Sequence, residues 1–218
     1  MATLKFLGTD SGFGTKNNSA YFEENDKLIL IDCGFTVFNE IKSKLDFNKY
    51  SEINIIITHL HNDHAGSLSQ VILYAWFIYN KKINVISKCE HIKEYLEITG
   101  TTKEAYDIKT DLPELEFIKT THVAELDSYG FKIKLNNKNI VYTGDTQTLE
   151  PFLPYLAEAN ELYTDASKFG GVHPKIDDII NTLQELANLT VFLMHLDDEI
   201  YIKNSVNDKF NFASNLII

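Results

Sequence analysis

A cluster of histidines and one aspartate is the part of the sequence best suited to chemistry. Three imidazoles and a carboxylate fall within six consecutive residues. Imidazole nitrogen and carboxylate oxygen are donors that zinc and other borderline divalent cations accept. Only seven histidines occur in 218 residues, which favours a metal site over the alternative of a solvated loop that is histidine-rich by chance. The residues are His59, His61, Asp63 and His64.

Three further candidate ligands lie downstream, each directly after a β-rich run: His122, Asp145 and His195. A lone histidine after a strand is usually structural, and Gly-Asp is a common turn, so each signal is weak by itself. Their joint placement at strand ends is what favours a shared site. Another histidine, His91, lies in a charged helical stretch and is expected to be a solvated surface residue.

The elements that must position these residues are predicted from apolar periodicity and turn residues. Strands clustered at the front and then interleaved with helices predict a layered α/β fold. Strands are predicted over Thr3–Leu7, Ser19–Phe22, Lys27–Ile31, Ile53–Thr58, Ile83–Ile86, Glu116–Lys119, Phe131–Leu135, Ile140–Thr143 and Val191–Met194. Helices are predicted over Thr36–Leu45, Ser67–Tyr79, Glu90–Thr99, Leu149–Ala157 and Lys175–Ala187.

The candidate ligands together resemble the metal pattern of the metallo-β-lactamase superfamily, and the resemblance spans nearly the whole chain. It implies a four-layer αββα sandwich, here a single domain over residues 1–218, with the site at its edge. It also implies two zinc ions. The resemblance assigns His59, His61 and His122 to the first zinc and Asp63, His64 and His195 to the second, with Asp145 as a ligand of both.

Two positions in this pattern narrow the chemistry that the resemblance implies. Residue 61 is His where the diiron oxygen-reducing branch carries Glu, which favours two Zn²⁺ over iron, with Mn²⁺ as an alternative metal. Residue 145 is Asp where the antibiotic-hydrolysing members carry Cys or Ser, which argues against a β-lactam substrate.

Other stretches resemble the ribonuclease Z-like phosphodiesterase branch of the superfamily. Gly8–Lys16 is similar to its amino-terminal glycine-rich loop, although an ordinary hairpin connection is the alternative for this segment. Thr143–Thr146 matches a Gly-Asp-Thr element. Tyr163–Ser167 aligns with a His-Glu-Ala-Thr element in which Asp165 stands for Glu, and His173 is the one residue kept from a His-Ser-Thr element.

The chemistry expected of such a site is attack of an activated water on phosphorus. Asp63 is expected to orient this water or take its proton. His173, a non-ligand in the family, is expected to protonate the leaving oxygen, with Asp165 fixing its tautomer and raising its pKa. For His173 the alternative is a structural residue that precedes Pro174 at a helix entry, and for Asp165 a structural role is equally favoured.

Charge composition points to a small substrate. The net charge is −11 and no arginine occurs, which disfavours a large nucleic-acid partner. We therefore expect a phosphodiester in a small nucleotide, foremost a cyclic nucleotide, as in compact members such as the phage-type anti-Pycsar phosphodiesterases. The alternatives are a tRNA 3′-processing endonuclease, a thioester or lactone hydrolase, and a nucleotide-binding protein that does not hydrolyse its ligand.

The remaining features concern location and assembly. Two cysteines without a CxxC pair and a start without an apolar leader favour the cytoplasm. The longest apolar run, within Val71–Tyr79, is too short to span a membrane. A helix over Ser67–Tyr79 would be apolar on every side, which is equally typical of a core helix and of a homodimer interface.

Overall fold

The computed structural model describes residues 2–217 and arranges the strands in two six-stranded mixed sheets. The first sheet has the order β1 (Lys5–Gly8), β2 (Ser19–Glu24), β3 (Lys27–Ile31), β4 (Glu52–Ile56), β5 (Ile83–Ile86) and β6 (Tyr106–Lys109). The second has the order β12 (Phe210–Phe212), β11 (Thr190–Leu196), β10 (Glu161–Ala166), β9 (Lys138–Tyr142), β8 (Tyr129–Leu135) and β7 (Leu115–Lys119).

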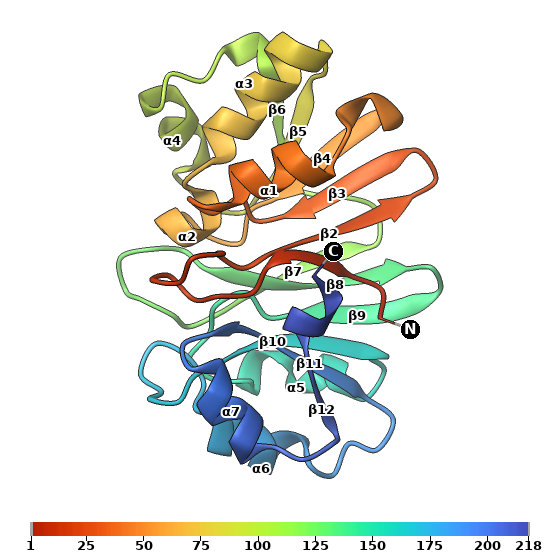
Figure 1. Ribbon diagram of the computed structural model, residues 1–218, viewed down its shortest axis with the longest axis vertical. Helices are drawn as coiled ribbons and strands as arrows, with labels where there is room; N and C mark the ends of the chain where they lie inside the picture. The colour runs from red at the N-terminus through yellow and green to blue at the C-terminus, as the bar shows by residue number, and fades with distance from the viewer. Residues whose placement is uncertain (1, 218) are drawn as a thin grey trace.

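The two sheets pack face to face, and helices cover both outer faces (Figure 1). Between the sheets lies an apolar layer that includes Phe6, Ile31, Phe131 and Tyr163. The first sheet is covered by α1 (Val37–Lys44), α3 (Leu68–Tyr79) and α4 (Ile92–Ile98), and the second by α5 (Leu153–Leu156), α6 (Ile176–Leu183) and α7 (Glu199–Ser205). This arrangement confirms the predicted α/β fold with αββα layers.

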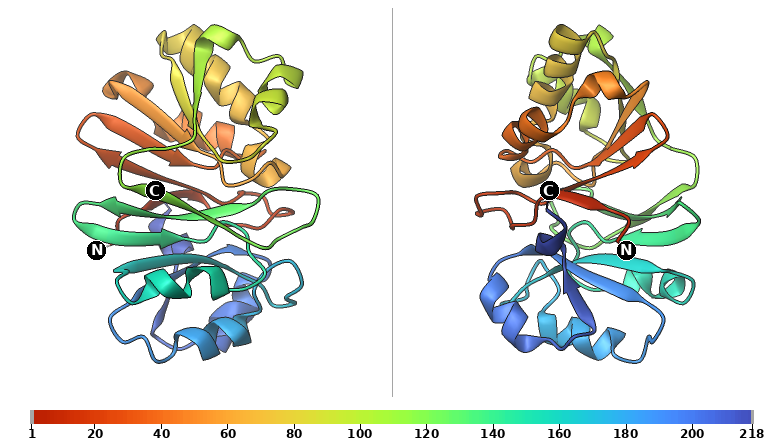
Figure 2. Two further views of the ribbon diagram at one scale, coloured as in Figure 1. Left: turned by 180° about the vertical axis from the view of Figure 1, so that it is seen from behind. Right: turned by 45° about the vertical axis from the view of Figure 1, so that its right-hand side comes forward.

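Strand direction explains why loops from both sheets meet at one edge. In the first sheet β3 to β6 are parallel, and β1 runs in the same direction because β2 is antiparallel to both β1 and β3. In the second sheet β9 to β12 are parallel, and β7 also runs with β9. The carboxyl ends of these strands therefore open onto the same side, where long loops extend beyond the sheets (Figure 2).

Several elements differ from the sequence-based prediction. Strands β6, β10 and β12 and helix α7 were not predicted, nor was the short helix α2 (Asn62–Ala65). The helix predicted over Leu149–Ala157 is a 3₁₀ turn, η3 (Glu150–Phe152), followed by the single-turn α5. Pro151 and Pro154 each lack the N–H that a continuous helix requires, which accounts for the break. The other 3₁₀ turns are η1 (Phe47–Lys49), η2 (Lys103–Ala105) and η4 (Ala213–Leu216).

Helix α3 buries only one of its apolar faces. Leu68, Val71, Ile72 and Ala75 pack into the core, whereas Phe77 and Ile78 on the same helix are 69% and 65% exposed. The expectation of a core helix thus holds for one side, and the other side is open to solvent. Among the described residues, no helix has the length and apolar content needed to cross a bilayer.

Candidate metal centre

The first group of candidate ligands converges from three loops, of which the one with Asp145 follows β9. His59 and His61 follow β4, and His122 follows β7. His61 Nδ1 lies 3.0 Å from His59 Nε2 and 3.2 Å from His122 Nε2, and His59 Nε2 is 3.8 Å from Asp145 Oδ2. One donor atom from each of these four residues falls within 4.8 Å of the others. The structure thus brings together every residue that the resemblance assigned to the first metal.

The second group shares Asp145 with the first. His195 Nε2 lies 3.1 Å from Asp63 Oδ2 and 3.3 Å from His64 Nε2, and His64 Nε2 lies 3.3 Å from Asp145 Oδ1. These donor atoms also fall within 4.8 Å of one another. His195 holds a left-handed backbone with φ of 52°, a conformation that non-glycine residues rarely adopt outside constrained sites. Asp145 thus belongs to both groups: its Oδ1 lies near His64, and its Oδ2 lies 3.6 Å from His195 Nε2 as well as near His59.

The chemistry of the donor set fits divalent cations. Burial, reinforced by the neighbouring His64, holds the pKa of His59 well below its ordinary value, so its ring is neutral and keeps a lone pair. A neutral imidazole carries one N–H, so the close nitrogen contacts around His61 cannot all be hydrogen bonds. Asp145 Oδ1 is buried and accepts no well-aligned hydrogen bond from the described residues, although His64 Nε2 lies 3.3 Å away. We conclude that this cluster is a divalent metal site.

A further buried carboxylate, Asp32, supports this cluster and was missed in the sequence analysis. Its Oδ2 lies 2.8 Å from His64 Nδ1, and its Oδ1 accepts a hydrogen bond from Thr58 N at 2.9 Å. Burial opposes a charge on His64, but Asp145 and Asp32 on the two sides of the ring outweigh it and raise the pKa of His64 well above its ordinary value. The surroundings of His64 therefore attract positive charge. A charged residue directly after the buried run Leu28–Ile31 was the available signal.

The loop between β10 and α6 also supports a candidate ligand. His122 Nδ1 lies 2.9 Å from the carbonyl oxygen of Val172, which can accept a hydrogen bond from it. A proton on Nδ1 leaves Nε2 free for the metal cluster, as is usual for histidine ligands. Gly170 and Gly171 precede this contact with φ of 78° and 89°, in the region that favours glycine.

His173 and Asp165 meet beside the metal cluster, as the sequence analysis expected. His173 Nδ1 lies 3.0 Å from Asp165 Oδ2, and the His173 ring centroid is 5.1 Å from that of His122 and 5.0 Å from that of His195. Burial opposes protonation of His173, but the hydrogen bond with Asp165 and the charge of Asp145 outweigh it and raise its pKa. A protonated imidazole at this position can donate a proton to a leaving group.

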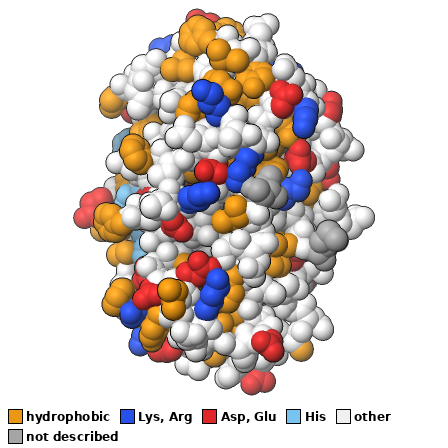
Figure 3. Space-filling model, in the orientation of Figure 1, with side chains coloured by type: hydrophobic (Ala, Val, Ile, Leu, Met, Phe, Trp, Pro, Cys, Tyr) orange, Lys and Arg blue, Asp and Glu red, His pale blue; other side chains and the backbone are white. Residues whose placement is uncertain are grey.

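A cavity of about 620 Å³ opens over the cluster and is bounded by loops from both sheets. Ser11, Gly12 and Phe13 of the glycine-rich loop line it, so this loop is part of the site as well as the connection from β1 to β2. Its described lining includes no lysine. The nearby lysines Lys168 and Lys175 form ion pairs with Asp198 and Asp177. Figure 3 shows histidine side chains at the left edge of the molecule, at the level where the two halves meet.

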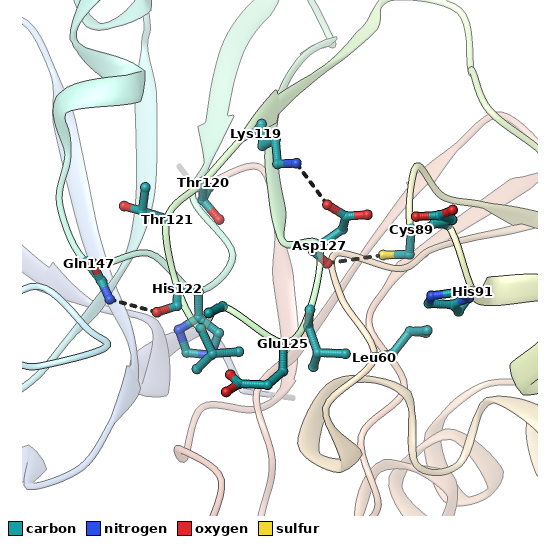
Figure 4. Close-up of a pocket in the computed structure, with 14 residues that line it drawn as sticks. Leu60, Cys89, His91, Lys119, Thr120, Thr121, His122, Glu125, Asp127 and Gln147 are labelled. Carbon is teal, nitrogen blue, oxygen red and sulfur yellow. Dashed lines mark hydrogen bonds and ion pairs between the residues drawn. The ribbon is translucent and has the colours of Figure 1, made fainter.

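A second pocket, of about 510 Å³, is lined in part by the loop that carries His122 (Figure 4). Lys119 and Asp127 form an ion pair of 2.8 Å at its wall, and the Cys89 thiol donates to the backbone oxygen of Asp127. His91 also lines it and is exposed, as predicted, with no part in the metal cluster. Of the described candidate ligands, His122 alone lines this pocket, and Val123 lines both this pocket and the cavity over the cluster.

A family model described as Anti-Pycsar protein Apyc1 matches residues 2–98 and 87–216. The chain is 29% identical over 229 residues to the anti-Pycsar protein Apyc1 of Bacillus phage 010DV004, with 89% of each protein covered.

Solved structures share the fold at lower sequence identity. The metallo-beta-lactamase fold protein YhfI from Bacillus subtilis superimposes with a TM-score of 0.77 at 17% identity, over 98% of this chain and 92% of that one. Human tRNase Z, short form, gives a TM-score of 0.70 at 17% identity, over 88% and 92%. The architecture is therefore that of the metallo-β-lactamase fold, as the sequence pattern predicted.

Proposed function

This chain belongs to the anti-Pycsar protein Apyc1 family, and on that premise we propose that it hydrolyses a cyclic nucleotide at a centre of two Zn²⁺. It is a metal-dependent hydrolase that acts on phosphodiester bonds. The observation that carries the finer proposal is that Asp145 belongs to both groups of ligands, because a shared carboxylate is typical of two metals held close together. His59, His61 and His122 would hold one ion, and Asp63, His64 and His195 the other.

The metals would supply a nucleophilic water at neutral pH and offset charge on the phosphoryl oxygens. The protein's own residues would do the remaining work. Burial acts to raise the pKa of Asp63, but hydrogen bonds with His195 and His64 outweigh it and hold that pKa far below its ordinary value. Asp63 is therefore ionised, and it lines the cavity, so it can orient the water by accepting a hydrogen bond from it.

The leaving oxygen would take its proton from His173. Asp165 accepts from His173 Nδ1, so Nε2 is the atom left to donate. The carboxylate also favours the charged form of the ring: burial acts to lower the pKa of His173, but the hydrogen bond with Asp165 and the charge of Asp145 outweigh it and raise this pKa. His173 would thus be the general acid and Asp165 its positioning residue.

The cavity favours a small substrate over tRNA. Its described lining includes no lysine, and the chain lacks arginine, so a polynucleotide would find few cations at the entrance. A single phosphodiester needs only the metals and His173. One domain of about this size is sufficient for such a reaction.

We also propose that the protein is a homodimer and works in the cytoplasm. The exposed face of α3, with Phe77 and Ile78, is the surface that a second copy would cover. Both cysteines are free, in keeping with a reducing compartment. Light scattering of the wild type and of Phe77→Lys tests the dimer, and an unchanged monomeric mass in both would contradict it.

The substrate is tested by incubating metal-loaded protein with cyclic mono- and dinucleotides, bis(p-nitrophenyl) phosphate, a thioester and a lactone. Elemental analysis after reconstitution with Zn²⁺ or Mn²⁺ gives the stoichiometry. We expect two Zn²⁺ per chain and opening of a cyclic nucleotide. Hydrolysis of the thioester or lactone without any phosphodiester would overturn the proposal, as would binding of nucleotide with no turnover.

A further inference from the structure

The side chain of Phe13 is the most exposed large apolar group of the described residues. Its relative exposure is 106%, so it packs against no part of the chain. Single exposed apolar residues are common on protein surfaces and need no explanation alone. Phe13, however, also lines the cavity over the metal cluster.

The loop that carries Phe13 is fixed by hydrogen bonds that do not involve its ring. Asp10 Oδ2 accepts from Thr15 N and Lys16 N, each at 2.9 Å, and Gly14 N donates to Ser11 O. A side chain at Gly14 would collide with that of Asp10, so the turn is closely packed on itself. The backbone at Phe13 is thus held in position, and its ring extends from this fixed loop without a contact of its own.

The same loop is attached directly to the metal site. Ser11 N donates to Leu196 O at 3.2 Å, and Leu196 follows the candidate ligand His195. A Cβ at Gly12 would lie 3.2 Å from Asp63 Oδ2, so the backbone of the loop runs against this carboxylate. Phe13 therefore follows directly after a residue that packs against the candidate ligand Asp63.

Apolar side chains from the second sheet line the same cavity. Val123 belongs to the loop after β7, and Val172, 39% exposed, belongs to the loop after β10. Phe13 comes from the first sheet, so the cavity has apolar groups contributed by both halves of the molecule. A planar ligand group attached to a phosphate at the metals could contact the aromatic ring of Phe13 and the aliphatic side chains of Val123 and Val172.

We propose that Phe13 is the stacking platform for the nucleobase of the substrate. The proposal rests on the proposed function, since it assumes a nucleotide at the metal centre. Stacking of a base on an aromatic ring stabilises binding without base-specific hydrogen bonds. The sugar and phosphate would lie over the histidines, and the base would lie on the ring of Phe13.

The test compares Phe13→Ala with the wild type on cyclic AMP and on 1,2-dideoxyribose 3′,5′-cyclic phosphate, which has no base. We expect KM for cyclic AMP to rise by roughly ten-fold or more in the variant, as loss of one base–aromatic stack predicts, with little change for the base-free analogue. Phe169→Ala is the matched control, because Phe169 is 76% exposed but does not line the cavity. An equal effect on both substrates, or no effect on either, would overturn the proposal.

A binding experiment decides the proposal even if no cyclic nucleotide is turned over. The chain has one tryptophan, Trp76, so Phe13→Trp adds one reporter to a known background. We expect AMP to quench the added fluorescence and ribose 5-phosphate to leave it unchanged. Absence of quenching by AMP would overturn the stacking role. Failure of the wild type to open any cyclic nucleotide, with quenching intact, would instead overturn the proposed function alone.

Discussion

Asp32 Oδ2 lies 2.8 Å from Nδ1 of His64, and neither side chain is exposed to solvent. This contact fixes the orientation of the ring and directs Nε2 toward Asp63, Asp145 and His195. Asp32 itself is held by Thr58, which donates to it from both its backbone N and its hydroxyl. The carboxylate is thus a positioning residue for a candidate ligand.

Replacing Asp32 by Asn is expected to weaken metal binding. Loss of a carboxylate behind a histidine ligand typically lowers metal affinity by about 10–100-fold. Competition with a chromophoric chelator measures this affinity. Asp107→Asn, which removes an exposed carboxylate paired with Lys82, is the control and should leave the affinity unchanged. An unchanged affinity in Asp32→Asn would show that the contact does not support the metal.

The candidate ligands could be predicted from the sequence because each follows a β-branched or apolar run, and strand ends meet at one edge. Asp32 follows such a run too, but an aspartate before Cys-Gly is indistinguishable from a turn residue. Its role depends on a contact with a residue 32 positions away. The Val172 carbonyl beside His122 could not be predicted either, since a backbone oxygen has no sequence signature.

Strands and helices could be predicted from the sequence where the spacing of apolar residues matches the buried face of the element. β10 was missed because it is buried on both faces and yet contains Thr164 and Asp165, so its sequence does not alternate. Asp165 can be buried because its carboxylate is hydrogen-bonded: it accepts from Thr146 N and from His173 Nδ1. The polar residues that obscured β10 in the sequence therefore include Asp165, one member of the candidate catalytic pair.

His61→Ala and His173→Ala are expected to separate metal binding from proton transfer. Removal of His61 takes one donor from the first group, so bound metal and activity should fall together. Removal of His173 should retain the metal and lower turnover of a cyclic nucleotide by roughly 10²–10⁴-fold, as loss of a general acid does. Elemental analysis and steady-state rates measure the two effects. Equal metal loss in both variants would exclude a non-ligand role for His173.

The leaving group provides a sharper test of His173. p-Nitrophenolate is a weak base and leaves without protonation, so His173→Ala should retain most of its rate on bis(p-nitrophenyl) phosphate. The rate on the cyclic nucleotide divided by the rate on the nitrophenyl ester should therefore be lower for this variant than for the wild type. A parallel loss on both substrates would indicate that His173 acts on substrate binding or on the structure of the site.

Gly171→Ala is expected to disturb the loop that contacts His122. Both Gly171 and Gly100 have positive φ, and a Cβ at either would meet no atom within 4 Å. Either substitution should therefore lower the free energy of unfolding by a similar amount, about 1 kcal/mol, because alanine disfavours a positive φ. Urea unfolding measures this change. Only Gly171→Ala should also weaken metal binding, because Val172 O contacts the candidate ligand His122. Equal metal affinity in the two variants would contradict a supporting role for this loop.

Glu161 should stabilise the fold at neutral pH and lose this effect in acid. It is buried and accepts from Lys138 Nζ at 2.6 Å, Tyr163 Oη at 2.7 Å and Thr3 N at 3.0 Å. Burial acts to raise its pKa, but these hydrogen bonds outweigh it and hold the pKa below the ordinary value of 4.5. The folded state thus binds its proton less readily than the unfolded state. The stabilisation is complete above the unfolded pKa and disappears as pH falls through the folded pKa.

Urea unfolding of Glu161→Gln at several pH values measures this effect. At pH 7 the variant should be less stable than the wild type by about 1–3 kcal/mol, the usual cost of breaking a buried charged hydrogen bond. The difference should shrink steadily below the ordinary pKa of 4.5. Glu116→Gln removes a surface carboxylate paired with Lys132 and should show a far smaller difference, because exposed ion pairs contribute little. A Glu161→Gln difference that does not vary with pH would mean that packing, and not charge, is what this carboxylate contributes.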